Sequence, residues 1–275
     1  MPPWVSVRRY LSKTQSVGPR EKRARGSEMM SYEQSDADML TLLSLLSDDA
    51  IRKIACIPDR RLCVYEGRRS KLSIRHSAGK CPSPPPGHRA RLQIRGGVIV
   101  TDASTRPKLS LPKQFANSLD KCRQQGKRFA IANFGIYNNQ SLAMGHANAL
   151  VFDLRERVIE RFDPAGRHSV RAEMLDVAIE SLFHARLPGW TYIGTRAAAP
   201  SIGVQSRADA FDGMCVTYSF MYTLLRLLNP SRSSREIQHY MIRGSAADLR
   251  RRVKRLNRFM MDTLRGHKRG TLSSL

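Results

Sequence analysis

Four residues of this chain, His146, Asp163, Gln205 and Cys215, are of the types that nucleophilic thiol chemistry uses. The first to consider is Cys215, near the start of the stretch Asp212–Pro230, which carries only one internal charge, Arg226. Asp212 suits an N-cap and Asn229-Pro230 a stop signal, so we predict an apolar helix buried inside a domain. In its first turn, free backbone N–H groups and the helix dipole favour a thiolate over a thiol. Cys215 is therefore a candidate nucleophile.

A histidine and an aspartate that could serve this thiol lie at the ends of two predicted strands. His146 opens a strand over 146–153, and Asp163 closes one over 158–163. With a turn centred on Leu154 and Arg155, the two residues face each other directly, with their Cβ atoms roughly 5 Å apart. A carboxylate so placed holds one imidazole nitrogen while the other nitrogen faces the thiol, which suits a catalytic triad.

Gln205 completes the set because it precedes the nucleophile by ten residues. A glutamine amide there can donate to a developing oxyanion beside the backbone N–H of Cys215. A loop glutamine means little by itself, so its weight comes from the order His, Asp, Gln, Cys. Weaker alternatives for the acid and the base are Glu160, His168 and His184.

The elements that must position these residues are short strands interleaved with helices. Strands are expected over 129–137, 146–153, 158–163 and 190–195, and helices over 112–125, 173–187, 212–229 and 234–242. This pattern predicts an α+β fold, with a small mixed sheet packed on the buried helix that carries the nucleophile at its N-terminus. Residues 93–102 have the pattern of a hairpin around Gly96 and Gly97.

Composition divides the chain into four parts. Residues 1–36 are expected to form a disordered basic arm, and 37–104 a small helical and irregular region that contains a Pro-rich linker. Residues 105–245 form the domain with the candidate site. Residues 246–275 are predicted to carry a basic amphipathic helix, in which Leu249, Val253, Leu256, Met260 and Leu264 mark the apolar face.

The charge of the chain predicts a polyanionic partner. Its 275 residues include 47 Lys and Arg against 23 Asp and Glu, a formal net charge of +24. Nucleic acid is the simplest partner for so large a positive charge, and the basic arm and the tail helix are the expected contact surfaces. No transmembrane segment is expected, because the longest apolar stretch is too short. The composition does not predict an oligomeric state.

The cysteines indicate a reducing compartment. Their number, five, is odd and their spacing irregular, which argues against a disulfide framework. The cluster of Cys56, Cys63, His76, Cys81 and His88 matches no familiar zinc spacing, so neither a metal nor another cofactor is predicted. We expect an intracellular protein, in the host cytoplasm or nucleus, or one packaged in a virion.

Four segments carry a resemblance to a known family: 145–153, 159–166, 204–205 and 212–219. They resemble the cysteine proteases of the ubiquitin-like-protease and adenain superfamily, and they look closest to divergent members of large DNA viruses. The likeness covers about residues 105–245. Position by position it implies that His146 is the base, Asp163 its orienting acid, Gln205 the oxyanion donor and Cys215 the nucleophile.

The resemblance implies an enzyme that cleaves peptide or isopeptide bonds, in a ubiquitin-like modifier or a viral precursor. The thiolate would attack the carbonyl, and an acyl-enzyme would then be hydrolysed with His146 carrying the proton. Two alternatives remain. One is a nucleic-acid-binding or packaging protein with an inactive protease-like fold, and the other is an acyltransferase that uses the same Cys-His-acid arrangement.

Overall fold

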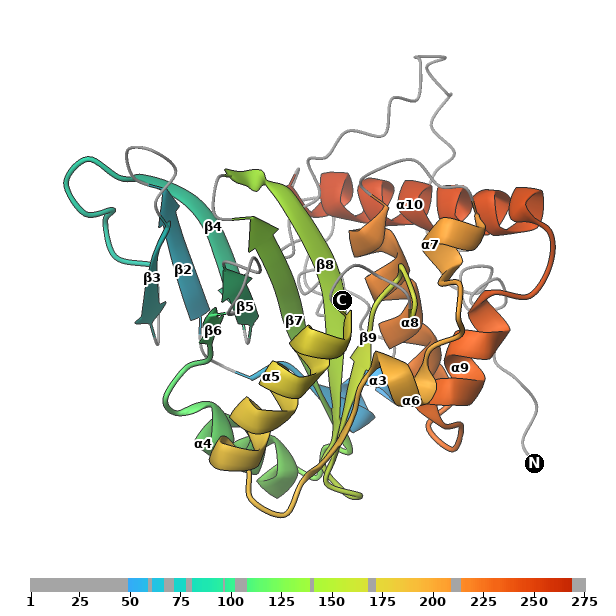
Figure 1. The fold of residues 1–275 in the computed structure, drawn as a ribbon, viewed down its shortest axis with the longest axis horizontal. Coiled ribbons are helices and arrows are strands. Elements are labelled where there is room, and N and C mark those ends of the chain that lie inside the picture. The colour runs from blue at the N-terminus through green and yellow to red at the C-terminus, as the bar shows by residue number, and fades with distance from the viewer. Residues whose placement is uncertain are drawn as a thin grey trace.

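The structure is a computed structural model with an α+β fold (Figure 1). It describes residues 49–58, 61–66, 72–77, 81–95, 97–101, 108–138, 141–167, 172–208 and 214–268. The basic arm 1–36 and the helix expected just after it lie outside the described residues. The predicted fold class, a small mixed sheet packed on a buried helix, is confirmed.

The main sheet has seven strands in the order β10-β9-β8-β7-β5-β6, with β1 also paired to β7. Its strands are β1 (Ala55–Cys56), β5 (Val98–Thr101), β6 (Lys108–Ser110), β7 (Phe129–Asn138), β8 (Ser141–Asp153), β9 (Val158–Phe162) and β10 (Thr191–Ile193). Parallel and antiparallel pairs are mixed. β7, β8 and β9 run antiparallel to their neighbours in this group, while β1 and β5 run parallel to β7 and β10 runs parallel to β9.

Helices cover both faces of the main sheet (Figure 1). They are α3 (Asp49–Ile54), α4 (Phe115–Gln124), α5 (Ala172–Arg186), α6 (Thr195–Ala198), α7 (Val204–Arg207), α8 (Cys215–Leu228), α9 (Ser234–Met241) and α10 (Ala246–Lys268). One face packs against α8, α9 and α10, and the other against α4 and α5. The sheet therefore separates two apolar cores, and its side chains alternate between them.

Strand β8 shows how this alternation places α8. Ala147, Ala149 and Val151 face the helix, whereas Leu150 and Phe152 face the α4–α5 side. The small alanine side chains let the helix approach the sheet, and the Ser219 hydroxyl on α8 donates a hydrogen bond to the Ala147 carbonyl at 3.2 Å. Helix α8 is thus held on the part of β8 that directly follows His146.

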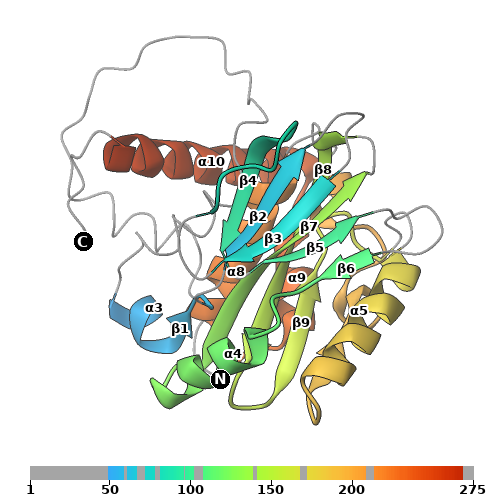
Figure 2. The same cartoon turned by 90° about the vertical axis from the view of Figure 1, so that its left-hand side faces the viewer.

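The N-terminal region differs from the prediction. Where 37–104 was expected to be helical and irregular, the described part is mostly strand. A separate three-stranded sheet has the order β3-β2-β4, formed by β2 (Arg61–Glu66), β3 (Leu72–Ser77) and β4 (Arg89–Arg95). Figure 2 shows this small sheet beside the main one.

The expected hairpin over 93–102 is wrong. Strand β4 belongs to the small sheet and β5 to the main sheet, so the two do not pair with each other. The Val98 side chain is fully buried, and β5 pairs in parallel with β7 through Val98 and Phe134. Its short run of apolar β-branched residues is typical of a strand in a sheet with parallel pairs.

The expectation of unpaired cysteines is also wrong. Disulfides join Cys56 to Cys122 and Cys63 to Cys81, and Cys215 is the free cysteine. The first bond joins residues 66 positions apart, because β1 docks on β7 beside α4. Irregular spacing along the chain could not reveal this contact. The inference of a reducing compartment rested on free cysteines, so they no longer support it.

Candidate active site

Cys215 is the first residue of α8. The sequence suggested Asp212 as the N-cap, but the N-cap is Met214. Met214 makes no side-chain cap hydrogen bond. The helix continues to the C-cap Asn229, and every residue from Cys215 to Leu227 is buried, as predicted. Its first hydrogen bond runs from the Tyr218 amide to the Met214 carbonyl, so the Cys215 amide lies ahead of the hydrogen-bonded ladder. This is the end of a helix at which negative charge is stabilised.

His146 and Asp163 are in direct contact. The distance between His146 Nε2 and Asp163 Oδ1 is 2.8 Å, and Asp163 is almost completely buried. The carboxylate is also fixed by the Ala165 amide, which donates to Oδ1 at 2.9 Å. His146 Nε2 is thereby committed to the acid, which leaves Nδ1 to face another group.

The strand register behind this contact differs from the one expected. Ala149 pairs with Phe162, and the turn covers Leu154 to Arg157, so Asn148 rather than His146 lies in line with Asp163. The shift is by two residues, which keeps every side chain on its predicted face. His146 and Asp163 are therefore diagonal neighbours, and the long imidazole side chain spans the offset.

The electrostatics of the pair favour an imidazolium beside a carboxylate. Burial opposes a charge on His146, but the hydrogen bond and charge of Asp163 outweigh it, and Cys215 contributes in the same direction through a hydrogen bond and its charge. Together they raise the pKa of His146 to about 10. Burial likewise opposes a charge on Asp163, yet His146, Arg161 and the Ala165 amide lower its pKa to about 2. Three of the four predicted residues thus interact with one another.

Gln205 reaches this neighbourhood through its backbone. Its amide donates to the Pro164 carbonyl at 2.9 Å, and the Gly203 amide donates to the Ala165 carbonyl at 3.1 Å. A Cβ atom on Gly203 would overlap the backbone of Ala165 and Gly166, so this close pairing requires glycine. The segment that carries Gln205 is therefore stacked on the loop that follows Asp163.

The side chain of Gln205 is not joined to the other three residues. Its Oε1 atom is buried with no hydrogen-bond partner, and among the described residues no hydrogen bond links the amide to Cys215 or His146. The amino group at the other end of the amide is the one that an oxyanion would need. The structure places Gln205 near the site by its backbone, and its predicted role stays a prediction.

Sequence reasoning missed Arg161. This guanidinium is fully buried and donates to Asp163 Oδ2 at 3.0 Å, on the carboxylate oxygen that His146 does not use. A lone arginine in a strand of an arginine-rich chain gives no signal by itself. Strand alternation could have revealed it. Arg161 lies two residues before Asp163, so the two side chains point to the same face.

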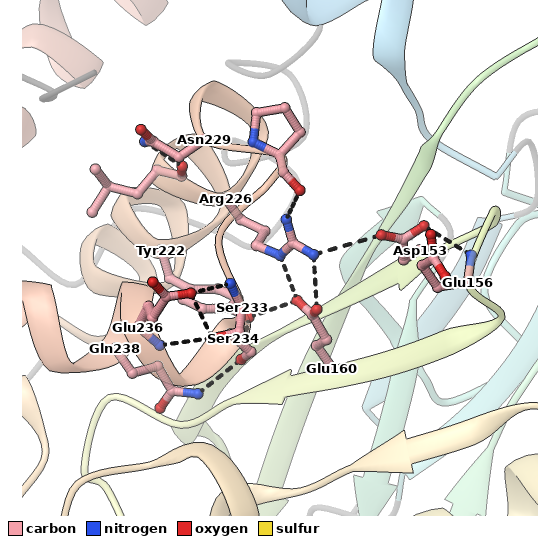
Figure 3. Close-up of polar contacts among 12 residues, drawn as sticks. Asp153, Glu156, Glu160, Tyr222, Arg226, Asn229, Ser233, Ser234, Glu236 and Gln238 are labelled. Carbon is pink, nitrogen blue, oxygen red and sulfur yellow. Dashed lines mark hydrogen bonds and ion pairs between the residues drawn. The ribbon is translucent and has the colours of Figure 1, made fainter. Parts of the chain in front are cut away.

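The alternative acid Glu160 lies next to Arg161 in β9 and therefore on the other face of the strand. Figure 3 shows it against Arg226 of α8. Its carboxylate accepts two hydrogen bonds from the buried Arg226 of α8, at 2.9 and 3.0 Å, and one from Tyr222 at 3.0 Å. Glu160 therefore anchors the C-terminal half of α8 to the sheet and does not contact His146. Of the alternative bases, His184 is an exposed residue of α5, and His168 lies outside the described residues.

Comparison with protein-family models found no match to this chain. No curated protein matches it either. None of the helices described here is both long and apolar enough to cross a bilayer. Within the same residues, no group of three or more potential metal ligands is present.

Proposed function

We propose that this protein is a cysteine peptidase of the ubiquitin-like-protease and adenain type, acting on peptide or isopeptide bonds. The observation that carries the proposal is the chain of contacts from Asp163 through His146 to Cys215 at the start of α8. The two disulfides support the proposal, because they use the other four cysteines and leave Cys215 as the free thiol. The substrate class, a ubiquitin-like modifier or a viral precursor, follows from the resemblance.

In the proposed reaction the proton of Cys215 passes to Nδ1 of His146, and the resulting thiolate attacks the carbonyl carbon. Asp163 holds Nε2 and stabilises the imidazolium. The oxyanion is stabilised by the Cys215 amide and by the amino group of Gln205. The imidazolium then protonates the leaving amine, an acyl-enzyme remains, and a water molecule deprotonated by His146 hydrolyses the thioester.

Two kinds of reagent test the proposal. One is a thiol-reactive substrate probe, and the other is a set of peptides and modifier conjugates with small residues before the cleaved bond. The probe should label Cys215, as mapped by mass spectrometry. Hydrolysis should fall on the order of 10⁶-fold in Cys215→Ala and about 10⁴-fold in Asp163→Asn. Unlabelled Cys215, or undiminished hydrolysis in folded Cys215→Ala, would overturn it, and acyl transfer to an amine or hydroxyl would make the protein an acyltransferase.

A second candidate function is nucleic-acid binding, and the surface of α10 favours it. The apolar face of α10 packs in the core through Leu249, Val253, Leu256 and Met260. Its exposed face carries cations at helical spacing, namely Arg251, Lys254, Arg255 and Arg258. A row of this kind matches the phosphate backbone of nucleic acid. Binding that persists unchanged in Cys215→Ala would show that this function does not depend on the thiol.

A further inference from the structure

The buried guanidinium of Arg161 lies between the candidate catalytic acid and a second carboxylate. Its NH2 group donates to Asp163 Oδ2 at 3.0 Å, its NH1 group to Asp176 Oδ1 at 2.7 Å, and its Nε to Asn148 Oδ1 at 2.9 Å. All three nitrogens of the guanidinium are therefore used. The group also lies over the ring of Phe134, at 5.4 Å from its centroid.

Asp176 is itself fixed in place from another element. One of its oxygens accepts from the Tyr192 hydroxyl at 2.7 Å, and the other accepts from the Thr195 amide and hydroxyl at 2.8 and 2.6 Å. A Cβ atom on Gly194 would overlap the Asp176 carboxylate, so only glycine allows this approach. The aspartate thus joins α5, β10 and the start of α6 to Arg161.

Such an arrangement does more than balance charge. A carboxylate can rotate about its last bond, and His146 and Ala165 hold only one oxygen of Asp163. Arg161 holds the other, and Asp176 prevents the guanidinium from moving. The plane of the Asp163 carboxylate is then fixed, and with it the direction of the imidazole.

On this basis we propose that Arg161, held by Asp176, is a positioning residue that locks Asp163 against His146. The inference rests on the proposed function for its catalytic meaning, but the geometry it describes can be tested without a substrate. It makes the site a line of alternating charges, His146, Asp163, Arg161 and Asp176, which starts at the thiol and ends at α5. Lysine could not replace Arg161, since an ammonium group has no planar fork to bridge two carboxylates.

The test compares Arg161→Lys with Arg226→Lys. Arg226 is a matched control, because it is also a buried arginine hydrogen-bonded to a β9 carboxylate, but it lies on the opposite face of the strand. Two readouts are followed from pH 5 to pH 10: the imidazole titration of His146 by NMR, assigned with His146→Gln, and the rate of Cys215 alkylation. The groups that face this system among the described residues are Cys215, Asp163, Arg161, Asp176 and Tyr192.

We expect Arg161→Lys to lower the pH at which His146 titrates and to slow alkylation near pH 6.5 by about tenfold for each pH unit of that decrease. Arg226→Lys should leave both unchanged although it also loses stability. The isosteric Asp176→Asn should act like Arg161→Lys with a smaller effect, and it serves if the lysine variant does not fold. Equal shifts in Arg161→Lys and Arg226→Lys, or none in the Arg161 and Asp176 variants, would overturn the proposal. Neither readout requires peptidase activity, so its outcome is separate from that of the proposed function.

Discussion

At the scale of single residues, the most informative contact joins His146 to Asp163. Asp163 is almost completely buried, while the His146 side chain keeps 30% of its surface exposed. The acid is thus shielded from water, and the base stays reachable. Cys215, at 7% exposure, is nearly buried and is among the groups that raise the pKa of His146.

Cys215 should be the residue that thiol reagents modify. An imidazolium at His146 stabilises a neighbouring sulfur anion, so we expect iodoacetamide to react with Cys215 at pH 6, where an ordinary thiol is almost entirely protonated. His146→Ala should slow this reaction about tenfold or more. Mass spectrometry without reductant should find one label per chain. A labelling rate at pH 6 that does not depend on His146 would contradict the ion pair.

The same pair should make stability depend on pH. The pKa of His146 rises on folding from 6.5 to about 10, so its contribution is complete below pH 6.5 and is lost as the pH rises through 10. The pKa of Asp163 falls from 3.8 to about 2, so its contribution is present above pH 3.8 and is lost as the pH falls through 2. The pair is fully stabilising between those unfolded values.

Asp163→Asn should therefore reduce the free energy of unfolding most between about pH 4 and pH 6.5. The difference in free energy of unfolding between this variant and the unmodified protein should narrow as the pH approaches 10. Urea denaturation at a series of pH values measures it, and His146→Gln should give the same narrowing. A gap that stays constant across the range would show that the two side chains do not titrate as a pair.

At the scale of elements, helix α8 is attached to the sheet in both of its halves. Its N-terminal half is hydrogen-bonded to β8 through Ser219, and its C-terminal half is tied to β9 through Arg226 and Glu160 (Figure 3). Arg226 also donates to the Pro230 carbonyl at 3.0 Å just past the end of the helix. The capping box of Ser233 and Glu236 then starts α9. The contacts of Arg226 thus fix the C-terminal end of α8, about three turns away from Cys215.

Breaking the Glu160–Arg226 pair from one side should be costly. Glu160→Leu or Arg226→Met alone leaves a buried charge without its main partner, and we expect each to lower the free energy of unfolding by about 3–5 kcal/mol. The double variant should cost less than the sum, because neither charge then remains. The exposed pair of Glu173 and Arg196 is the control, and Glu173→Gln should change stability by only about 0–1 kcal/mol. Additive effects at Glu160 and Arg226 would argue against a coupled pair.

At the scale of the whole molecule, apolar packing and positive charge occupy different faces of α10. The helix packs on α8 and near α7, and Asn257 and Thr217 lie within hydrogen-bonding distance at 3.2 Å. Thr217 is two residues beyond Cys215 in the same helix. The cationic row of α10 is therefore carried by an element that rests directly on the helix of the candidate nucleophile.

Replacing the four exposed cations of α10, Arg251, Lys254, Arg255 and Arg258, by glutamine should weaken nucleic-acid binding and flatten its dependence on salt. Each phosphate contact contributes about 0.9 to the slope of log binding constant against log salt concentration. The magnitude of that slope should therefore fall by about 3 to 4. The control replaces four exposed cations beside α4 and α5, Lys113, Lys121, Arg123 and Arg186. Equal losses in the two variants would mean that net charge alone matters, and anionic vesicles bound more tightly than nucleic acid would point to a lipid partner.

Local features of the sequence determined a large part of this protein. The absence of charge between Cys215 and Arg226 specified a buried helix, and short β-rich runs specified β7, β8 and β9 within a few residues. Parity along β8 and β9 also placed His146 and Asp163 on one face. These predictions succeeded because helix and strand periodicity depend on neighbours three, four or two positions apart.

Only the tertiary structure decided which distant segments meet. The two-residue shift in register, the disulfide from Cys56 to Cys122 and the bridge from Arg161 to Asp176 all depend on how whole elements dock. The split of β4 and β5 between two sheets has the same origin. Their physical cause is the burial of two apolar cores on opposite faces of one sheet, and no short stretch of the chain encodes that arrangement by itself.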